Sequence, residues 1–352
     1  MKTILFHYPD LDNNRVFNQH IFGFNEPIIY LKEKLNSLGY GFKTSDKNSL
    51  VDCEWVIFFN APLSELLPQS GLKNKLKKYK FLLLGKNKEN ARDLYKECIE
   101  IGFNKIALIL WEGKAVIPEN YSKKLHDKFP VIFTWNDDLV DNVKFFKFYH
   151  PIAKLPEASK IPYEKKKLLV NISMNKFSSH PQELYSARLK SIRYFEKNYP
   201  DNFDLFGIRW NEPKNRLQKL FPFLVENHPC YRGKIDRKID VLPNYKFSLC
   251  YENLADEKGY VSEKIFDCIR CGTVPIYWGA SNIADFVDTD AFIDRRQFKS
   301  DKELADFIVN IGEEEYNKYI VAAESYLKSE KFNLFSSENF VETIIKTLIK
   351  IY

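Results

Sequence analysis

The strongest constraint on the fold is an alternation of short apolar runs with longer amphipathic stretches along most of the 352 residues. The runs are bounded by Gly, Asn, Pro or charged residues, which is typical of strands buried on both faces of a parallel sheet. The runs that we expect to be strands are Trp55–Phe59, Phe81–Leu84, Ile106–Trp111, Val131–Phe133, Leu168–Ser173, Phe203–Phe206, Phe247–Tyr251 and Val274–Trp278. The stretches that predict helices include Glu26–Leu38, Glu89–Ile101, Pro181–Asn198 and Val261–Cys271. Such alternation predicts an α/β fold with parallel sheets.

The domain organisation follows from a change near the middle of the chain. The segment His150–Pro162 carries three prolines and few periodic apolar positions, so we expect a linker there. This gives two Rossmann-like domains, 1–150 and 151–330, and a C-terminal helical tail, 331–352. Beyond Ser300 the chain is expected to be helical, because Ser300-Asp301-Lys302-Glu303 is a capping-box signal and Phe340–Ile351 is an apolar stripe.

Charge and cysteine content narrow the class of partner and the compartment. Lys and Arg total 53 against 47 Asp and Glu. This excess of positive charge suits an anionic ligand or membrane, but it is too small to indicate a nucleic-acid-binding surface. The first residues lack the apolar core of a secretory signal, and six cysteines are too sparse for a disulfide scaffold. We therefore expect a cytoplasmic protein. Its tail Ile344–Tyr352, with Lys346 and Lys350, is a candidate for peripheral contact with an anionic inner membrane face, although docking onto the domains is the preferred expectation.

The stretch 244–287 carries the most chemistry. Its first strand, Phe247–Tyr251, ends in Glu252 and Asn253, which places polar side chains at a carboxyl strand end, where open α/β sheets bind ligands. Those side chains suit the ribose and sugar hydroxyls of a nucleotide sugar. An ordinary βαβ unit with a charged first helical turn is the alternative interpretation.

The loop and helix that follow add an aromatic ring and cations. Gly259 gives the backbone freedom, Tyr260 supplies an aromatic face, and Ser262-Glu263-Lys264 opens a helix. A helix N-terminus offers free N–H groups and partial positive charge, to which Lys264 adds a full charge. These features predict a site for a diphosphate.

The string YKFSLCYEN, then GYVSEKIFDCIRCGTVPIYWGASNIADFV, closely resembles the signature block of the α-1,3/4-fucosyltransferases, glycosyltransferase family 10. The resemblance implies a GT-B arrangement, with two Rossmann-like domains facing across a cleft and GDP-fucose on the C-terminal domain. It also implies that the N-terminal domain supplies the acceptor side and the catalytic base. The residues that it marks as donor-binding are Arg188, Asn253, Tyr260, Glu263 and Lys264. The chain departs from the pattern at Tyr251, where Phe is commoner, and in the loop LADEKG, so the donor sugar stays open.

An inverting sugar transfer needs a carboxylate base and cations on the leaving diphosphate. Glu112 directly follows the strand Ile106–Trp111, in a setting that resembles that of the family's catalytic glutamate, and is the predicted base. Glu119 and Asp137 are the competing carboxylates. Arg188 and Lys264 are predicted to hold the diphosphate, so a divalent metal is not expected to be essential.

Several patterns imitate metal sites but are expected to be structural. Asp288-Thr289-Asp290 is interpreted as a solvated loop, and Asn136-Asp137-Asp138 as a turn or helix cap. The pair Cys268 and Cys271 has no second pair of cysteines, so buried thiols are expected. The six histidines show no metal-binding spacing.

The leading hypothesis is a bacterial-type fucosyltransferase that moves L-fucose from GDP-fucose to a galactose- or N-acetylglucosamine-containing glycan. The acceptor is expected to be a lipopolysaccharide or another surface oligosaccharide, lipid-linked during assembly, with the α-1,3 or α-1,4 linkage open. A same-fold transferase using another GDP-6-deoxy sugar and a non-catalytic glycan-binding module are the alternatives. A glycoside hydrolase and a nucleic-acid binder lack the corresponding signatures.

Overall fold

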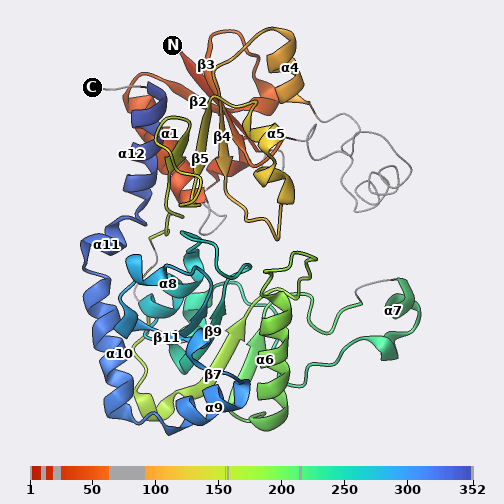
Figure 1. Ribbon diagram of the computed structural model, residues 1–352, viewed down its shortest axis with the longest axis vertical. Helices are drawn as coiled ribbons and strands as arrows, with labels where there is room; N and C mark the ends of the chain where they lie inside the picture. The colour runs from red at the N-terminus through yellow and green to blue at the C-terminus, as the bar shows by residue number, and fades with distance from the viewer. Residues whose placement is uncertain are drawn as a thin grey trace. The chain divides into compact units, whose positions relative to one another are not determined.

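The structure is a computed structural model, and it describes residues 2–8, 13–18, 25–62, 92–154, 156, 158–213 and 216–349 (Figure 1). The chain divides into two compact units. Unit 1 comprises Met1–Lys154 together with Phe335–Tyr352, and unit 2 comprises Leu155–Leu334. The sequence-based boundaries lie at residues 150 and 330, and the tail 331–352 falls mostly within unit 1.

Unit 1 is built on a six-stranded sheet with the order β2-β1-β3-β4-β5-β6, in which every neighbouring pair is parallel. The strands are β1 (Thr3–His7), β2 (Gly41–Thr44), β3 (Cys53–Phe59), β4 (Ile106–Leu110), β5 (Val131–Thr134) and β6 (Phe145–Lys147). The helices described are α1 (Asn25–Ser37), α4 (Leu94–Glu100), α5 (Lys123–His126) and α12 (Ser337–Ile349). All five residues of β4 are buried, as expected for an apolar run in the middle of a parallel sheet.

Unit 2 is built on a five-stranded parallel sheet with the order β11-β10-β9-β7-β8. Its strands are β7 (Lys167–Ile172), β8 (Phe203–Phe206), β9 (Tyr245–Tyr251), β10 (Val274–Trp278) and β11 (Ile293–Asp294). Its helices are α6 (Tyr185–Asn198), α7 (Arg216–Leu220), α8 (Glu263–Arg270), α9 (Asp301–Asn310), α10 (Glu313–Tyr326) and α11 (Glu330–Asn333). The core lies on the sheet, where Phe247, Leu249 and Ile276 are almost fully buried.

These elements confirm the predicted α/β fold and most of the predicted strands. The predicted strand Phe81–Leu84 and the first residues of Glu89–Ile101 lie outside the described residues. The strands β1, β2, β6 and β11 were not expected. β1 has only five residues and a polar one at each end, so its strand character comes from pairing with β2 and β3 and not from a long apolar run.

The C-terminal part follows the predicted capping and docking. The Oγ of Ser300 accepts a hydrogen bond from the N–H of Glu303 at 3.1 Å, which starts α9. The apolar side of α12 is buried through Phe340, Val341 and Ile344, and α12 packs beside α1 in unit 1 (Figure 1). The expected docking is therefore observed for the described residues of the tail, whose apolar side is buried. Among the described helices, none combines the length and the apolar character that crossing a bilayer requires.

Candidate functional site

A small pocket opens at the carboxyl ends of β7 and β9 in unit 2. From β7 the chain continues to β8, toward one edge of the sheet, and from β9 it continues to β10, toward the other edge. The carboxyl ends of β7 and β9 therefore form the switch point at which doubly wound sheets bind ligands. The pocket has a volume of about 30 Å³, and its charged lining residues are Arg188, Lys238, Lys264 and Asp267. Three cations and one carboxylate thus meet where the fold favours a ligand.

Arg188 projects from α6 and is only 4% exposed. Its guanidinium donates two long hydrogen bonds, from Nη1 to the carbonyl of Tyr251 at 3.5 Å and from Nη2 to the carbonyl of Met174 at 3.4 Å. Within the described part of the chain no carboxylate forms an ion pair with it. Burial lowers the pKa of Arg188 below its ordinary value, because water no longer stabilises the charge. A buried cation with such weak partners is suited to receive an anion.

Lys264 reaches the same pocket from the first turn of α8, but it is already ion-paired. Its Nζ lies 2.7 Å from Oε2 of Glu252 and 2.9 Å from Oγ of Ser262. Burial alone would lower the pKa of Lys264, but the attraction of the Glu252 and Glu263 carboxylates outweighs it and raises that pKa. Lys264 therefore remains charged, with part of its charge offset by Glu252.

Glu252 organises the start of α8, a role that the sequence analysis missed. Its side chain is fully buried and accepts hydrogen bonds from both the N–H and the Oγ of Ser262, at 2.9 and 2.8 Å. A side chain at Gly279 would place its Cβ 2.5 Å from Cγ of Glu252 and 2.4 Å from the hydroxyl of Tyr277. Glycine at this position therefore makes room for the carboxylate. Glu252 therefore acts as an internal anchor that holds the start of α8, and its buried side chain is not accessible to a ligand.

The other predicted donor-binding residues lie around this anchor. The amide of Asn253 donates to the hydroxyl of Tyr260 at 3.2 Å, and Tyr260 is almost fully buried. Neither residue is part of the pocket lining in the described structure. Glu263 begins α8, is half exposed, and lies 3.4 Å from Nζ of Lys238. The structure thus places Arg188 and Lys264 together in the pocket lining, Glu263 outside that lining beside Lys238, and Asn253 with Tyr260 in the adjacent loop.

Lys238 and Asp267 are lining residues that the sequence analysis did not select. Lys238 lies on a short 3-10 turn (Lys238–Asp240), and its Nζ is 2.7 Å from Oδ2 of Asp267 on α8. Burial acts to lower the pKa of Lys238, but Asp267 and Glu263 more than compensate and raise it. Asp267 stands four residues after Glu263, so one face of α8 offers both carboxylates to this lysine. The four-residue spacing of Glu263 and Asp267 could be recognised in the sequence, but Lys238 is distant in sequence from both.

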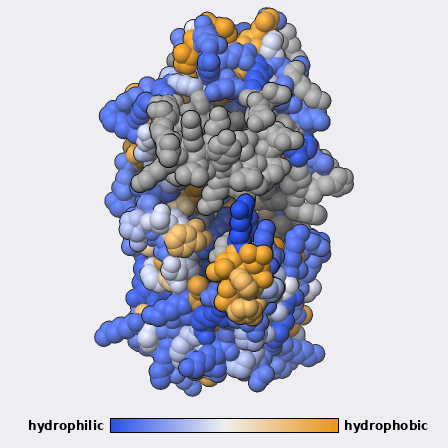
Figure 2. Space-filling view, turned by 90° about the vertical axis from the view of Figure 1, so that its right-hand side faces the viewer, coloured by the Kyte–Doolittle hydropathy of each residue, from blue (hydrophilic) through white to orange (hydrophobic). Residues whose placement is uncertain are grey.

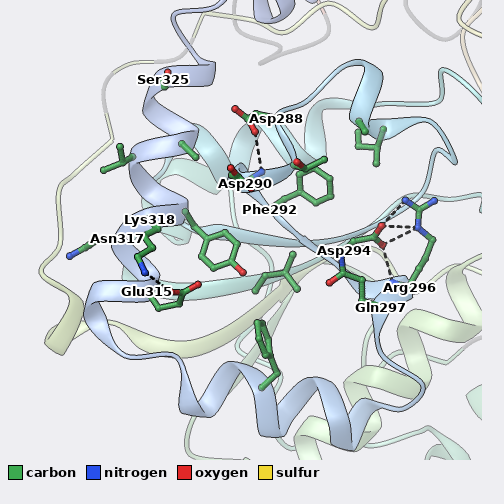
Figure 3. A pocket seen from close by; sticks show the side chains of 18 of the residues that line it. Asp288, Asp290, Phe292, Asp294, Arg296, Gln297, Glu315, Asn317, Lys318 and Ser325 are labelled. Carbon is green, nitrogen blue, oxygen red and sulfur yellow. Dashed lines mark hydrogen bonds and ion pairs between the residues drawn. The ribbon is translucent and has the colours of Figure 1, made fainter.

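The larger hollow of unit 2 lies elsewhere. It has a volume of about 960 Å³ between α10 and the segment around β11, and it contains none of the predicted site residues (Figure 3). Several of its charged lining residues are paired with one another, as Figure 3 shows for Asp294 with Arg296 and for Glu315 with Lys318. The larger volume of this hollow therefore does not make it the candidate site. The small pocket is preferred because it combines the switch point with a weakly compensated buried cation.

Glu112 lies at the carboxyl end of β4 in unit 1, and its backbone is fixed by two buried asparagines. The Oδ1 of Asn60 accepts from the N–H of Trp111 and of Glu112, each at 3.0 Å. The Nδ2 of Asn120 donates to the carbonyl of Glu112 at 3.1 Å and to Oδ1 of Asn60 at 2.8 Å. The half-buried Glu112 side chain is thus presented from a rigid strand end. Its role as a base stays a prediction.

The competing carboxylates and the metal-like patterns have structural roles. Asp137 forms an ion pair with Lys147 at 2.5 Å, and Glu119 lies on a 3-10 turn (Pro118–Tyr121). Oδ1 of Asp288 accepts from the N–H of Asp290 and caps a turn, so this pattern is a cap. The carboxamide of Asn136 likewise accepts from the N–H of Asp138.

The cysteines also have no metal-binding arrangement. Cys268 and Cys271 are buried free thiols, and burial raises the pKa of Cys271 to about 12. A thiol with such a pKa stays protonated and unreactive near neutral pH. In the portion of the chain that the structure describes, no group of His, Cys, Asp and Glu is placed to hold a metal ion.

Two parallel-sheet units, one with a cationic pocket at its switch point, define the chain as a member of the GT-B class of glycosyltransferase folds. Solved structures of that class are similar over the whole chain. An alpha1,3-fucosyltransferase with GDP-fucose matches 99% of this chain and 90% of its own, with a TM-score of 0.54 and 16% identity. Anabaena HepE in complex with UDP and glucose covers 100% of both chains, with a TM-score of 0.56 and 10% identity. At such identities these matches establish the fold alone.

The family is established by sequence. The model of the C-terminal region of glycosyltransferase family 10 (fucosyltransferase) matches residues 167–343, just over half of the chain, and the chain belongs to this family. An alpha-(1,4)-fucosyltransferase of Arabidopsis thaliana is 38% identical over 102 residues, 28% of this chain and 25% of the relative. An alpha-(1,3)-fucosyltransferase of Helicobacter pylori is 39% identical over 74 residues, 21% of this chain and 15% of the relative. The chain thus matches a quarter or less of the length of these curated relatives.

Proposed function

We propose that this protein is an inverting glycosyltransferase that transfers L-fucose from GDP-fucose to a hydroxyl of a galactose- or N-acetylglucosamine-containing glycan. The observation that carries the proposal is the buried, weakly compensated Arg188 beside Lys264 at the switch point of unit 2. Family membership and relatives named as alpha-(1,3)- and alpha-(1,4)-fucosyltransferases support the choice of donor.

The donor diphosphate is assigned to the cations of the small pocket. With a volume of about 30 Å³ the pocket is too small for a whole nucleotide, so it takes the edge of a phosphate at its mouth. Arg188 and Lys264 contact the diphosphate in this proposal, and Lys238 adds charge beside them. Asn253, Tyr260 and Glu263 complete the donor side from the adjacent loop and the first turn of α8. With this much fixed positive charge, the leaving diphosphate does not require a divalent metal.

The reaction transfers one proton from the acceptor and releases one leaving group, GDP. The acceptor oxygen attacks the anomeric carbon as its bond to the diphosphate oxygen breaks, and GDP leaves with the bonding electrons. The carboxylate of Glu112 takes the acceptor proton, which requires a hydrogen bond of about 2.6–3.2 Å. Attack opposite the leaving group inverts the anomeric centre. Arg188 and Lys264 stabilise the negative charge that develops on the diphosphate, so their effect is largest in the transition state.

The acceptor and the compartment extend the same proposal. We assign the acceptor to a bacterial surface oligosaccharide or lipopolysaccharide, built on a lipid carrier at the cytoplasmic face of a membrane. All six cysteines are free thiols, which fits a reducing compartment.

The test is incubation with GDP-fucose and a panel of small lactosamine acceptors, followed by mass and linkage analysis. We expect addition of one fucose with inverted anomeric configuration, and loss of transfer in Lys264→Ala. Transfer only from another GDP-6-deoxy sugar would replace the donor assignment. Glycan binding without transfer from any GDP-sugar would instead identify a non-catalytic binding module.

A further inference from the structure

Unit 2 carries an exposed apolar projection on α7 and the following 3-10 turn (Pro222–Leu224). In Figure 1, α7 lies at the end of an extended excursion of the chain, away from the unit 2 sheet. Five large apolar side chains there are between 43% and 81% exposed: Leu217, Leu220, Phe221, Phe223 and Leu224. Figure 2 looks onto this tip and shows a compact apolar patch within a mostly hydrophilic surface. We call these five residues the arm tip.

The root of the projection is firmly attached to unit 2. Trp210 is 2% exposed, its Nε1 donates to the carbonyl of Ser173 at 2.7 Å, and its ring packs against His228 at a centroid distance of 4.8 Å. The Oδ1 of Asn211 accepts from the N–H of His228 at 2.8 Å, which closes the excursion at its base. A fixed root with an apolar end in solvent indicates that the tip serves a surface outside this unit.

The charge of the segment identifies the kind of surface. Between Asn211 and His228 the sequence contains Lys214, Arg216 and Lys219, with Glu212 and Glu226 at the two ends of the excursion and no Asp or Glu between them. Arg216 and Lys219 are exposed on the described part of the arm. Aromatic and leucine side chains that insert between lipids, flanked by Lys and Arg that contact headgroups, are the pattern by which peripheral proteins bind anionic membranes.

We propose that the arm tip inserts into the surface of an anionic lipid bilayer and tethers this protein there. The convex shape of the projection suits a fluid surface, which can close around it, better than a rigid partner. The arm also takes the place of the C-terminal tail as the membrane contact, because the apolar side of α12 is buried in unit 1. A membrane tether would hold the protein beside the lipid-linked acceptor proposed above, but it does not depend on that reaction.

The test is co-sedimentation of the full chain with vesicles, in the absence of donor, using phosphatidylcholine alone or mixed with phosphatidylglycerol. We expect binding to the mixed vesicles only, and at least about tenfold weaker binding for the double variant L220S/F223S, since two inserted apolar side chains are lost. Val321→Ser is the matched control, because this α10 side chain is 66% exposed but lies outside the arm. It should bind as the wild type does.

The basic residues are tested separately. We expect R216Q/K219Q to bind mixed vesicles about 10- to 30-fold more weakly, as two headgroup contacts are lost, while Lys346→Gln on the exposed side of α12 binds normally. Urea unfolding of each variant reports whether it is folded, independently of lipid and of GDP binding. Absence of wild-type binding to mixed vesicles, or unchanged binding of L220S/F223S, would overturn the proposal. A wild-type oligomer that L220S/F223S converts to a monomer, with lipid binding unchanged, would assign the tip to self-association.

Discussion

The carboxyl strand ends of the two units bury different kinds of polar group. In unit 2 the buried polar groups include charged ones, with Glu252 fully buried and Arg188 nearly so. Among the described residues of unit 1, the buried polar side chains include no Asp, Glu, Lys or Arg, and the amides of Asn60 and Asn120 form one hydrogen-bonded cluster around the backbone of Glu112. Buried charges are costly unless they are paired or receive a ligand, whereas buried amides need only hydrogen bonds.

This difference matches the proposed division of the two substrates between the units. The proposed donor carries a diphosphate, and fixed cations at unit 2 match it. The proposed acceptor reacts through a neutral hydroxyl, for which unit 1 needs one well-placed carboxylate and a rigid backbone. Substitutions in each unit test whether GDP affinity, assigned to the charges of unit 2, and kcat, assigned to the positioning of Glu112 in unit 1, change separately.

The largest effect is expected from Glu112→Gln in unit 1. Loss of the base should lower kcat by about 10²–10⁴-fold, while GDP affinity stays unchanged because the cations of unit 2 are intact. Steady-state transfer kinetics and GDP titration measure the two quantities. Glu119→Gln is the control and should retain activity. If Glu119→Gln is the inactive variant, the base has been misassigned.

The next effect is expected from Glu252→Gln in unit 2. This change removes the buried partner of Lys264 and a charged acceptor for Ser262, so unfolding free energy should fall by about 3–5 kcal/mol. Urea unfolding measures it, and hydrogen exchange of the first turn of α8 localises it. Glu342→Gln, at an exposed pair with Lys346, is the control and should show no measurable change. Equal stability of the two variants would show that Glu252 is not an anchor.

A smaller effect is expected from Asn120→Ala in unit 1. Its Oδ1 accepts from the N–H of Ala61 at 2.7 Å, and that group would be left without its partner. Unfolding free energy should fall by about 1–3 kcal/mol, and kcat should fall without a change in GDP affinity. A loss of GDP affinity with kcat unchanged would break the proposed separation between the units.

The sequence was sufficient for much of unit 2. The strand, loop, helix and strand from β9 to β10 are contiguous, so the carboxyl strand end and the start of α8 could be inferred from local pattern alone. Lys264 was selected from its place at the start of a helix and from family resemblance, Arg188 from the resemblance alone, and the structure places both in one pocket.

The remainder depends on contacts between distant residues. The anchoring role of Glu252 requires knowing that it is buried and that Gly279 leaves it space, neither of which is visible in a local pattern. Lys238 joins α8 from 29 residues before Asp267. In unit 1, Asn60 and Asn120 lie 60 residues apart, so the cluster that fixes Glu112 appears only in the folded chain.

The central claim is that Arg188, a buried cation without a carboxylate partner in the described structure, holds the donor diphosphate. Titration of GDP into the wild type, Arg188→Met and Glu112→Gln by calorimetry tests it most directly. We predict about 10- to 100-fold weaker binding for Arg188→Met, because charge-assisted hydrogen bonds are lost, and wild-type affinity for Glu112→Gln. Because the substitution removes a poorly compensated buried charge, Arg188→Met should remain as stable as the wild type. GDP binding by a folded Arg188→Met at wild-type affinity would contradict the account.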